Sequence, residues 1–204
     1  MFWPWSVAGE TPVLRGRNVL LRLPQMRDYE AWYELRRASR DFLKPFEPRW
    51  SEADLARRVY THRVRRARQE ALDGTDYSFF IFLPDGGKEE LVGGITLSNV
   101  RRRAAQFVNL GYWMGQSYAG KGIMTEAVSV VVPFVFDTLD LHRIHAAFLP
   151  GNTASRRVLE KNGFVEEGFA KHYLQIDGRW EDHVLFGLTR ERYDQLRMGR
   201  GRWA

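Results

Sequence analysis

The sequence has no cysteine among its 204 residues. This absence excludes a disulfide framework and a thiolate metal site, and it suits a reducing cytoplasm. No apolar run approaches the roughly 18 residues that a membrane-spanning helix needs. The segment 1–5 is apolar, but it lacks the basic start and the long apolar stretch of a signal peptide. We therefore expect a cytoplasmic protein that makes no membrane contact.

Acidic residues are outnumbered by basic ones: 25 Asp and Glu stand against 31 Lys and Arg, and the formal net charge is +6. The segment 57–68 is rich in arginine, and 101–103 is an arginine triplet. Such charge favours polyanions, namely RNA, a ribosome surface or a phosphorylated cofactor. A solvated helix face and a polar loop explain the same residues without any partner, and charge alone does not decide between these interpretations.

The hydrophobic pattern changes character near the middle of the chain. The expected strands are 18–23, 77–83, 91–99, 106–114, 143–149, 164–175 and 179–188, and the expected helices begin near Asp28 and cover 51–72, 121–137, 153–161 and 189–198. The three strands between 77 and 114 follow one another through short turns, which predicts an antiparallel meander. Pro133 should kink or shorten its helix because it donates no hydrogen bond.

After residue 114, helices alternate with strands, which predicts a βαβ crossover within the same sheet. The expected fold class is therefore α+β (mixed α/β), with a mixed, mainly antiparallel sheet of about seven strands and flanking helices. No repeat or linker interrupts the pattern. We expect a single domain over 1–204, with a core at about 13–190 and short N-terminal and basic C-terminal extensions.

A turn with Gly115, Gly120 and Gly122 joins strand 106–114 to the helix that follows. A strand–turn–helix junction leaves backbone N–H groups unpaired at the helix start, where the positive end of the helix dipole also lies. Such a junction suits a phosphate or a pyrophosphate.

Two common phosphate-binding patterns fit this turn poorly. A Walker A loop needs a hydroxyl residue after its lysine, but Gly122 follows Lys121. A dinucleotide fingerprint needs a third glycine where this chain has Thr125.

A third pattern fits better. The segment 120–127 resembles the acetyl-CoA pyrophosphate loop of the GCN5-related N-acetyltransferases (GNAT), and 152–164 is similar to that family's second cofactor motif. One expected helix and one expected strand separate the two segments. The resemblance covers roughly 13–190 and implies a GNAT-type fold with the crossover at the cofactor loop, no metal, and acetyl-CoA as the cosubstrate.

A narrower resemblance lies outside these cofactor motifs. The segments 42–48, 167–171 and 173–184 resemble the RimJ/RimL-type ribosomal-protein alanine N-acetyltransferases. This implies acetylation of the N-terminal alanine of a ribosomal protein, with ribosome or rRNA contact through the basic patches, by a monomer or homodimer. Acetylation of a small amine or antibiotic stays an alternative, as does a basic ribosome-assembly or RNA-binding factor with secondary catalysis.

The resemblance also implies a set of cofactor-binding residues. They are Trp113, Met114, Tyr118, Ala119, Gly120, Lys121, Gly122, Ile123, Met124, Thr125, Asn152 and Ser155. Backbone N–H groups of 118–125 would hold the pyrophosphate, and a Cβ at the two central glycines would hinder that approach. The backbone at 113–114 would pair with the pantetheine arm as an added strand does. Asn152 is expected to cap its helix and to touch the same arm.

The reaction is attack of a neutral amine on a thioester. An α-amine has a pKa near 8, far below the 10.4 of a lysine side chain, so a weak base or a water relay suffices. The segment 152–164 contains no tyrosine, although many GNAT enzymes use one there as the acid. The RimJ/RimL branch implies Ser155 instead, with Tyr173 as a further catalytic candidate.

Acceptor-side candidates are Phe46 and Glu47, which would line the acceptor peptide, with Glu47 paired to its charged N-terminus. A structural loop explains the same residues. Asn109 stands where the related branch often has a glutamate, and it would hold a water. His142 and His145 lie near one strand but should point to opposite faces, and no set of ligands for a metal ion is complete.

Overall fold

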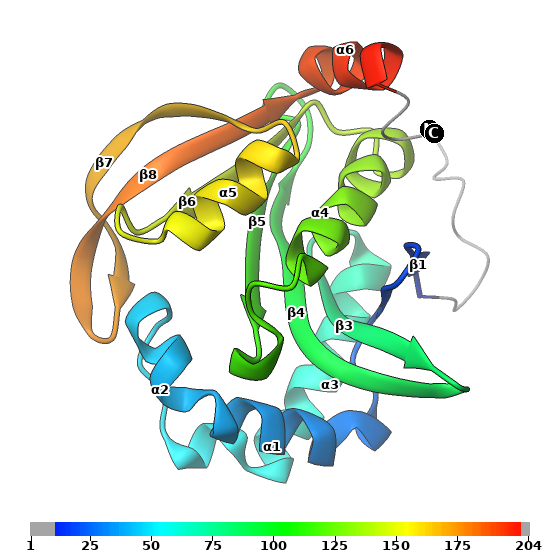
Figure 1. Ribbon diagram of the computed structural model, residues 1–204, viewed down its shortest axis with the longest axis vertical. Coiled ribbons are helices and arrows are strands. Elements are labelled where there is room, and N and C mark those ends of the chain that lie inside the picture. The colour runs from blue at the N-terminus through cyan, green and yellow to red at the C-terminus, as the bar shows by residue number, and fades with distance from the viewer. Residues whose placement is uncertain (1–10, 201–204) are drawn as a thin grey trace.

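The computed structural model describes residues 11–200, so the apolar segment 1–5 and most of the basic tail lie outside the described residues. One eight-stranded sheet runs through the molecule (Figure 1). Its strands are β1 (Val13–Arg15), β2 (Leu20–Arg22), β3 (Tyr77–Asp85), β4 (Lys88–Arg101), β5 (Phe107–Met114), β6 (Arg143–Phe148), β7 (Val165–Ile176) and β8 (Arg179–Thr189). The spatial order is β1-β2-β3-β4-β5-β6-β8-β7.

Only β5 and β6 pair in parallel, and every other neighbouring pair is antiparallel. The predicted mixed, mainly antiparallel sheet with one crossover is confirmed. The strand that the sequence did not indicate is β1, whose three residues are too few to show an alternating pattern.

The helices surround this sheet. They are α1 (Tyr29–Ala38), α2 (Arg40–Leu43), α3 (Arg57–Asp73), α4 (Ile123–Pro133), α5 (Thr153–Lys161) and α6 (Arg190–Arg200). Short 3₁₀ turns occupy Met26–Asp28, Lys44–Phe46, Glu52–Leu55 and Gln116–Tyr118.

Two expected helices differ from the observed ones. Ser51 and Asp54 do form a capping box, but it opens the short turn at Glu52–Leu55, and the extended ψ of Ala56 separates that turn from α3. The helix expected at 121–137 ends as an α-helix at Pro133 and continues as a π-helix over Phe134–Thr138. The shortening at Pro133 was predicted, because proline cannot donate the next backbone hydrogen bond.

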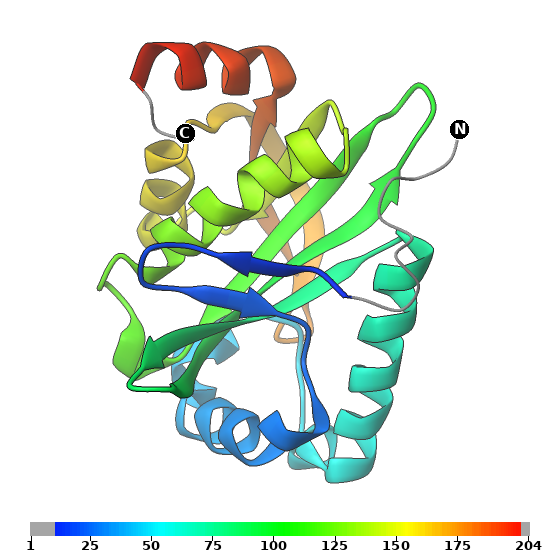
Figure 2. The same cartoon turned by 90° about the vertical axis from the view of Figure 1, so that its right-hand side faces the viewer.

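Strand alternation divides the core between the two faces of the sheet. Phe79 and Ile81 of β3 belong to the large core that α4 and α5 cover. Phe80 and Phe82 face the other way and pack in a smaller core with Trp32 of α1 and Tyr60 of α3. In Figure 2, α4 lies across the upper part of the sheet, and α1 and α3 lie below and beside it.

The parallel pair β5–β6 separates partway along its length. Pairing runs from Phe107 opposite Arg143 to Leu110 opposite Ala146 and then stops. Beyond that point β5 continues to Met114 along β4, and β6 continues to Phe148 along β8. The two strands therefore form a wedge that is open at their carboxyl ends.

Candidate active site

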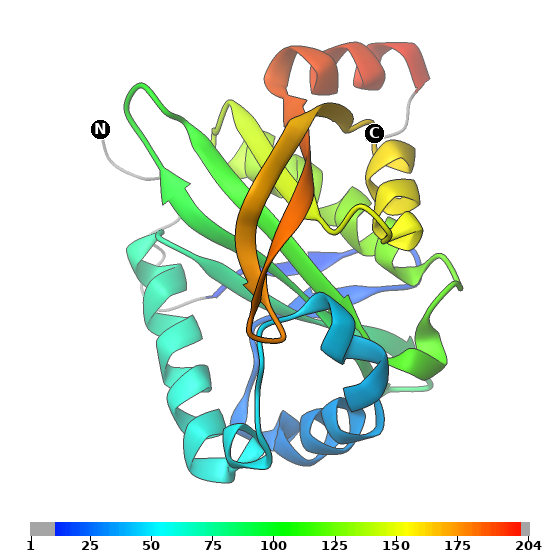
Figure 3. The same cartoon turned by 90° about the vertical axis from the view of Figure 1, so that its left-hand side faces the viewer.

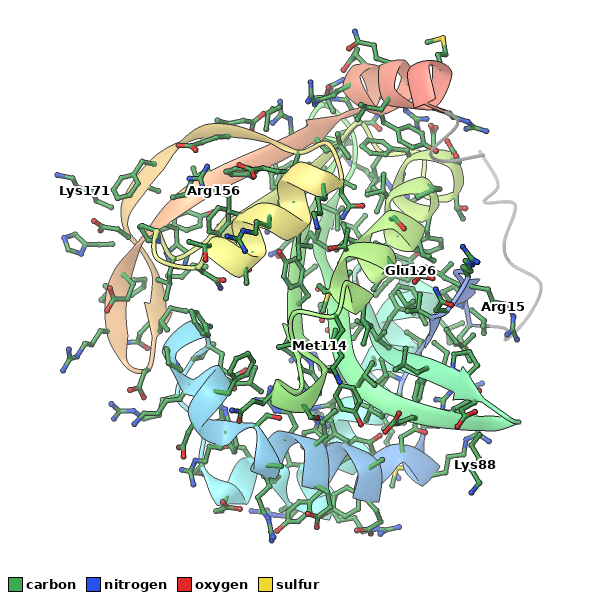
Figure 4. The ribbon with its side chains drawn as sticks, viewed as in Figure 1. Arg15, Lys88, Met114, Glu126, Arg156 and Lys171 are labelled. Atoms are coloured by element: carbon green, nitrogen blue, oxygen red, sulfur yellow. The ribbon has the colours of Figure 1, made fainter. Side chains whose placement is uncertain are left out.

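The glycine turn leads from the end of β5 into α4, beside Met114 (Figure 4). Gly120 and Gly122 have φ of +76° and +82°, in the left-handed region that side chains other than glycine rarely adopt. A Cβ at either position would meet no described atom within 4 Å. Backbone conformation, independent of any ligand, is therefore sufficient reason for glycine here.

The first turn of α4 presents free backbone donors. Gly122 is the N-cap and offers no side-chain cap, and the first hydrogen bond of the helix runs from Glu126 N–H to the Gly122 oxygen. The N–H groups of residues 123–125 therefore lack an intrahelical acceptor and point outward with the positive end of the helix dipole. This helix start fits a phosphate group.

The backbone N–H groups of residues 118 and 119 already donate hydrogen bonds within the turn. The N–H of Tyr118 donates to the Gly115 oxygen at 3.0 Å, and that of Ala119 donates to the Gln116 oxygen at 3.2 Å. The N–H groups of 118 and 119 are thus used within the turn, and of the predicted row 118–125 those of 120–125 stay the predicted pyrophosphate donors. The turn itself is anchored on α1, because the Gln116 N–H donates to the buried Ser39 hydroxyl at 3.0 Å.

Side chains of the turn point to a neighbouring strand. The Tyr118 hydroxyl donates to Glu90 of β4 at 2.5 Å, and this hydrogen bond raises the pKa of Tyr118. The Lys121 ammonium lies 5.7 Å from the Tyr118 ring centre. Lys121 is exposed and adds a positive charge at the mouth of the turn.

The second motif lies across the wedge, at the start of α5. Asn152 is the N-cap, and its Oδ1 accepts from the Ser155 N–H at 3.0 Å, so the predicted cap is confirmed. The Ser155 carbonyl accepts a long hydrogen bond, 3.4 Å, from the Tyr112 hydroxyl. Burial raises the pKa of Tyr112 to about 12. Tyr112 therefore stays protonated beside Ser155, and the sequence did not single it out.

Asn162 joins the two motifs and was also missed. Its side-chain amide is buried and donates to the Thr125 oxygen at 3.1 Å and to the Val158 oxygen at 2.8 Å. One amide thus ties the end of α5 to the first turn of α4. Asn162 lies within the motif 152–164, which could have marked it as a functional residue. The sequence did not show which groups its side chain contacts.

The carboxylate of Glu47, in the acceptor-side loop, accepts hydrogen bonds from other side chains of this protein. Arg36 of α1 donates to both carboxylate oxygens, at 2.6 and 3.0 Å, and the Trp50 indole donates at 2.5 Å. The Arg36 guanidinium lies 5.0 Å from the Trp50 ring and 4.9 Å from that of Trp113. Glu47 is thus already paired within the protein, and its contact with an incoming ammonium group stays a prediction.

The tip of the β7–β8 hairpin docks on the same loop. The Asp177 N–H donates to the Glu47 oxygen at 3.0 Å, and the Asp177 carboxylate pairs with Arg49 and Lys44. A cavity of about 670 Å³ beside this contact is lined by Lys44, Trp50 and Asp177 among others. Phe46 is exposed close to the hairpin.

The remaining candidates lie apart from the start of α5. Tyr173 is exposed on β7, and its ring packs 5.8 Å from that of buried His183. No contact joins Tyr173 to Ser155 among the residues that the structure describes. Asn109 is half-buried on β5, with Ser98 on one side and His145 on the other.

Among residues 11–200, no group of three or more His, Asp or Glu side chains is placed to hold a metal ion. Over the same residues, no helix combines the length and the apolar character required to cross a bilayer.

A wedge between parallel strands, with a helix start at its mouth that offers free backbone donors, fits a phosphorylated cosubstrate. The family model described as an acetyltransferase (GNAT) domain matches residues 18–165. The chain belongs to this family and is an acetyl-CoA-dependent N-acetyltransferase.

Individual relatives agree with this assignment. The chain is 38% identical over 181 residues to "Probable N-acetyltransferase YjcK" of Bacillus subtilis, covering 86% of this chain and 96% of the relative. It is 36% identical over 172 residues to the "[Ribosomal protein uS5]-alanine N-acetyltransferase" of Escherichia coli, covering 84% and 88%. Mycobacterium smegmatis RimJ, solved with CoA-disulfide, superposes with a TM-score of 0.81 at 35% identity over 96% of both chains.

Proposed function

We propose that this enzyme acts in the cytoplasm and acetylates the N-terminal alanine of a ribosomal protein. One observation carries the proposal: loop 42–48 and the β7–β8 hairpin, which resemble the RimJ/RimL type outside the cofactor motifs, meet in space. Their contact is the hydrogen bond from Asp177 N–H to the Glu47 oxygen. Lys44, Pro48 and Asp177 from these segments line the cavity of about 670 Å³, and we assign recognition of the acceptor to it. The relative named for uS5 alanine supports the same choice.

Two parts of acetyl-CoA, the pyrophosphate and the pantetheine arm, can be assigned to the described geometry under this proposal. The backbone donors of 120–125 fit the pyrophosphate, with Lys121 adding charge. Beyond the last β5–β6 pair, the backbone at 113–114 has a strand neighbour on one side only, which leaves the other side for the pantetheine amides. That path leads to Asn152 and to Ser155.

Ser155 and Tyr112 supply the proton that the leaving thiolate takes up. Ser155 is in the first turn of α5, and the hydroxyl of Tyr112 on β5 donates to its carbonyl oxygen. Burial raises the pKa of Tyr112 to about 12, so this hydroxyl stays protonated well above neutral pH. On the acceptor side, an α-amine needs less help than a lysine, since a larger fraction of it is already neutral near pH 7.

Acetylation of a peptide panel tests the acceptor. We expect kcat/KM for an alanine-initiated ribosomal peptide to exceed that for the same peptide with a blocked N-terminus and an internal lysine by at least tenfold, because the two amines differ by about two pKa units. Small amines and aminoglycosides serve as the comparison set. A preference for a small amine over every alanine-initiated peptide, or unchanged ribosomal N-termini in a strain without this gene, would contradict the proposal.

A ribosome contact is favoured by the outer face of α3. Arg57 pairs with Glu30 and Arg66 pairs with Glu70, whereas Arg58 and Arg65 have no ion pair among the described residues. Two turns of helix separate Arg58 from Arg65, so they share a face. Figures 2 and 3 show α3 at the edge of the molecule, where such a face is accessible.

Two matched double variants test this contact on purified ribosomes. Arg58→Gln with Arg65→Gln should weaken binding and reduce the slope of log affinity against log salt by about 2, since each phosphate contact contributes about 0.9. Arg57→Gln with Arg66→Gln removes the same charge from residues already paired with acids, so a smaller change is expected. Equal effects of the two variants would show that net charge alone, and not this face, binds the ribosome.

A further inference from the structure

Among residues 11–200, no helix covers one face of the sheet over β6, β8 and the part of β5 that pairs with β6. Val108, Ile144 and Phe186 point into the large core, so their neighbours along each strand point the other way. The smaller core, under α1 and α3, is built on β2, β3 and β4, and only Trp113 near the end of β5 packs against it. Figure 3 views the molecule from the side of this uncovered face, with the β7–β8 hairpin in front of the other strands.

Three residues lie in one row on that face. Asn109 of β5 is opposite His145 of β6, and His145 is opposite Gly187 of β8. Asn109 and His145 are both half-exposed. The row comes one residue before the last β5–β6 pair, at the base of the wedge. Because α4 and α5 cover the opposite face, an acceptor amine must reach the wedge from the side of this row.

Gly187 makes room for a carboxylate. A Cβ at Gly187 would lie 2.4 Å from Oε2 of Glu167, so the Glu167 carboxylate lies over this glycine, directly across the ladder from His145. The irregular register between Glu166 and Gly168 of β7 places Glu167 there. Arg143 holds both carboxylate oxygens at 2.6 Å from Nη1. The Cβ positions of cross-strand neighbours such as His145 and Gly187 are about 5 Å apart. The Glu167 carboxylate above Gly187 is therefore within reach of the His145 ring.

The charges around His145 favour its neutral form. Burial and the charge of Arg143 lower the pKa of His145, and the charge of Glu167 acts in the opposite direction. Its ring packs edge-on to Phe107 at 4.9 Å. The described residues provide no hydrogen-bond partner for its nitrogens, so one nitrogen lone pair is available at neutral pH.

His183 is the other histidine near the acceptor side, and it is a weaker candidate. It is only 2% exposed, and its Nδ1 is engaged with the Glu181 oxygen at 2.9 Å. A base must touch the substrate or a water molecule, and His183 has almost no surface for either.

We propose that His145 is the base that deprotonates the acceptor's ammonium group, with Asn109 and Glu167 as positioning residues. An N–H bond of the ammonium breaks, and its proton passes to the free imidazole nitrogen, directly or through one water. The amine lone pair is then released for attack on the thioester carbon. The Glu167 carboxylate stabilises the imidazolium that results. The inference needs an amine acceptor but does not require the ribosomal substrate.

The test is the pH dependence of kcat in His145→Gln, at saturating acetyl-CoA. We expect kcat to fall about tenfold at pH 7, because only about one-tenth of an α-amine with a pKa near 8 is neutral there without a base, with KM changing less than threefold. The deficit should shrink at pH 9, where an α-amine is already neutral. The same deficit is expected with any amine that the enzyme accepts, so a wrong ribosomal substrate leaves this test intact.

Three comparisons complete the design. His142→Gln replaces an exposed histidine three residues away and should leave kcat unchanged. Glu167→Gln should move the acidic limb of the wild-type profile to lower pH, because the carboxylate raises the pKa of His145; a purely structural role would lower activity equally at every pH. The proposal is overturned if folded His145→Gln keeps more than a third of wild-type kcat at pH 7, or if His183→Gln alone shows the pH-dependent loss.

Discussion

Gly120→Asp should weaken acetyl-CoA binding about 100-fold while the fold survives. The substitution places a carboxylate in the turn whose backbone donors fit a pyrophosphate. Two like charges about 5 Å apart repel by about 3 kcal/mol at an effective dielectric constant near 20, which corresponds to about two orders of magnitude in affinity. Binding of CoA, measured by calorimetry, and KM for acetyl-CoA should both show the loss.

Gly120→Asn is the matched control. Asparagine has nearly the shape of aspartate and tolerates the same left-handed φ, +76° at this position. A Cβ here would meet no described atom within 4 Å, so both variants should melt within a few degrees of the wild type. The asparagine variant should lose less than tenfold in affinity. If the two variants weaken binding equally, the turn does not hold a phosphate through charge.

The parts of this site that local chemistry determines could be predicted from the sequence. Left-handed turns select glycine at 120 and 122, a helix start selects Asn152, and Pro133 disrupts an α-helix because it lies in its interior. Each of these depends on a few neighbouring residues. The strand β1 was not predicted, because its three residues are too few to show the alternation of apolar and polar residues that marks a strand.

The acceptor side could not be predicted, because its contacts depend on strand register and on distant partners. Glu47 was expected to face a substrate, but the fold places Arg36 within 2.6 Å of it. His145, Gly187 and Glu167 come together only through the β6–β8 register and the irregularity in β7. No spacing in the sequence encodes either arrangement.

Arg22→Met should lower the free energy of unfolding by about 3 kcal/mol. Arg22 of β2 is 6% exposed, and its guanidinium donates to both oxygens of buried Asp28, each at 2.7 Å. It also donates to Glu89 and lies 4.0 Å above the Phe82 ring. Removing one partner of a buried ion pair leaves an uncompensated charge, which costs about 3–5 kcal/mol. Urea unfolding, with the slope compared between variants, measures the loss.

Arg27→Met is the control, because Arg27 is 67% exposed and lies 3.6 Å from the same Glu89. Its loss should change stability by less than about 0.5 kcal/mol. Arg22→Met with Asp28→Leu removes both buried charges and should recover most of the stability. If this double variant is no more stable than Arg22→Met alone, the buried Asp28 charge is not the cause. Asp28 directly precedes α1, which carries Arg36, so this pair also fixes the helix that supports the acceptor-side loop.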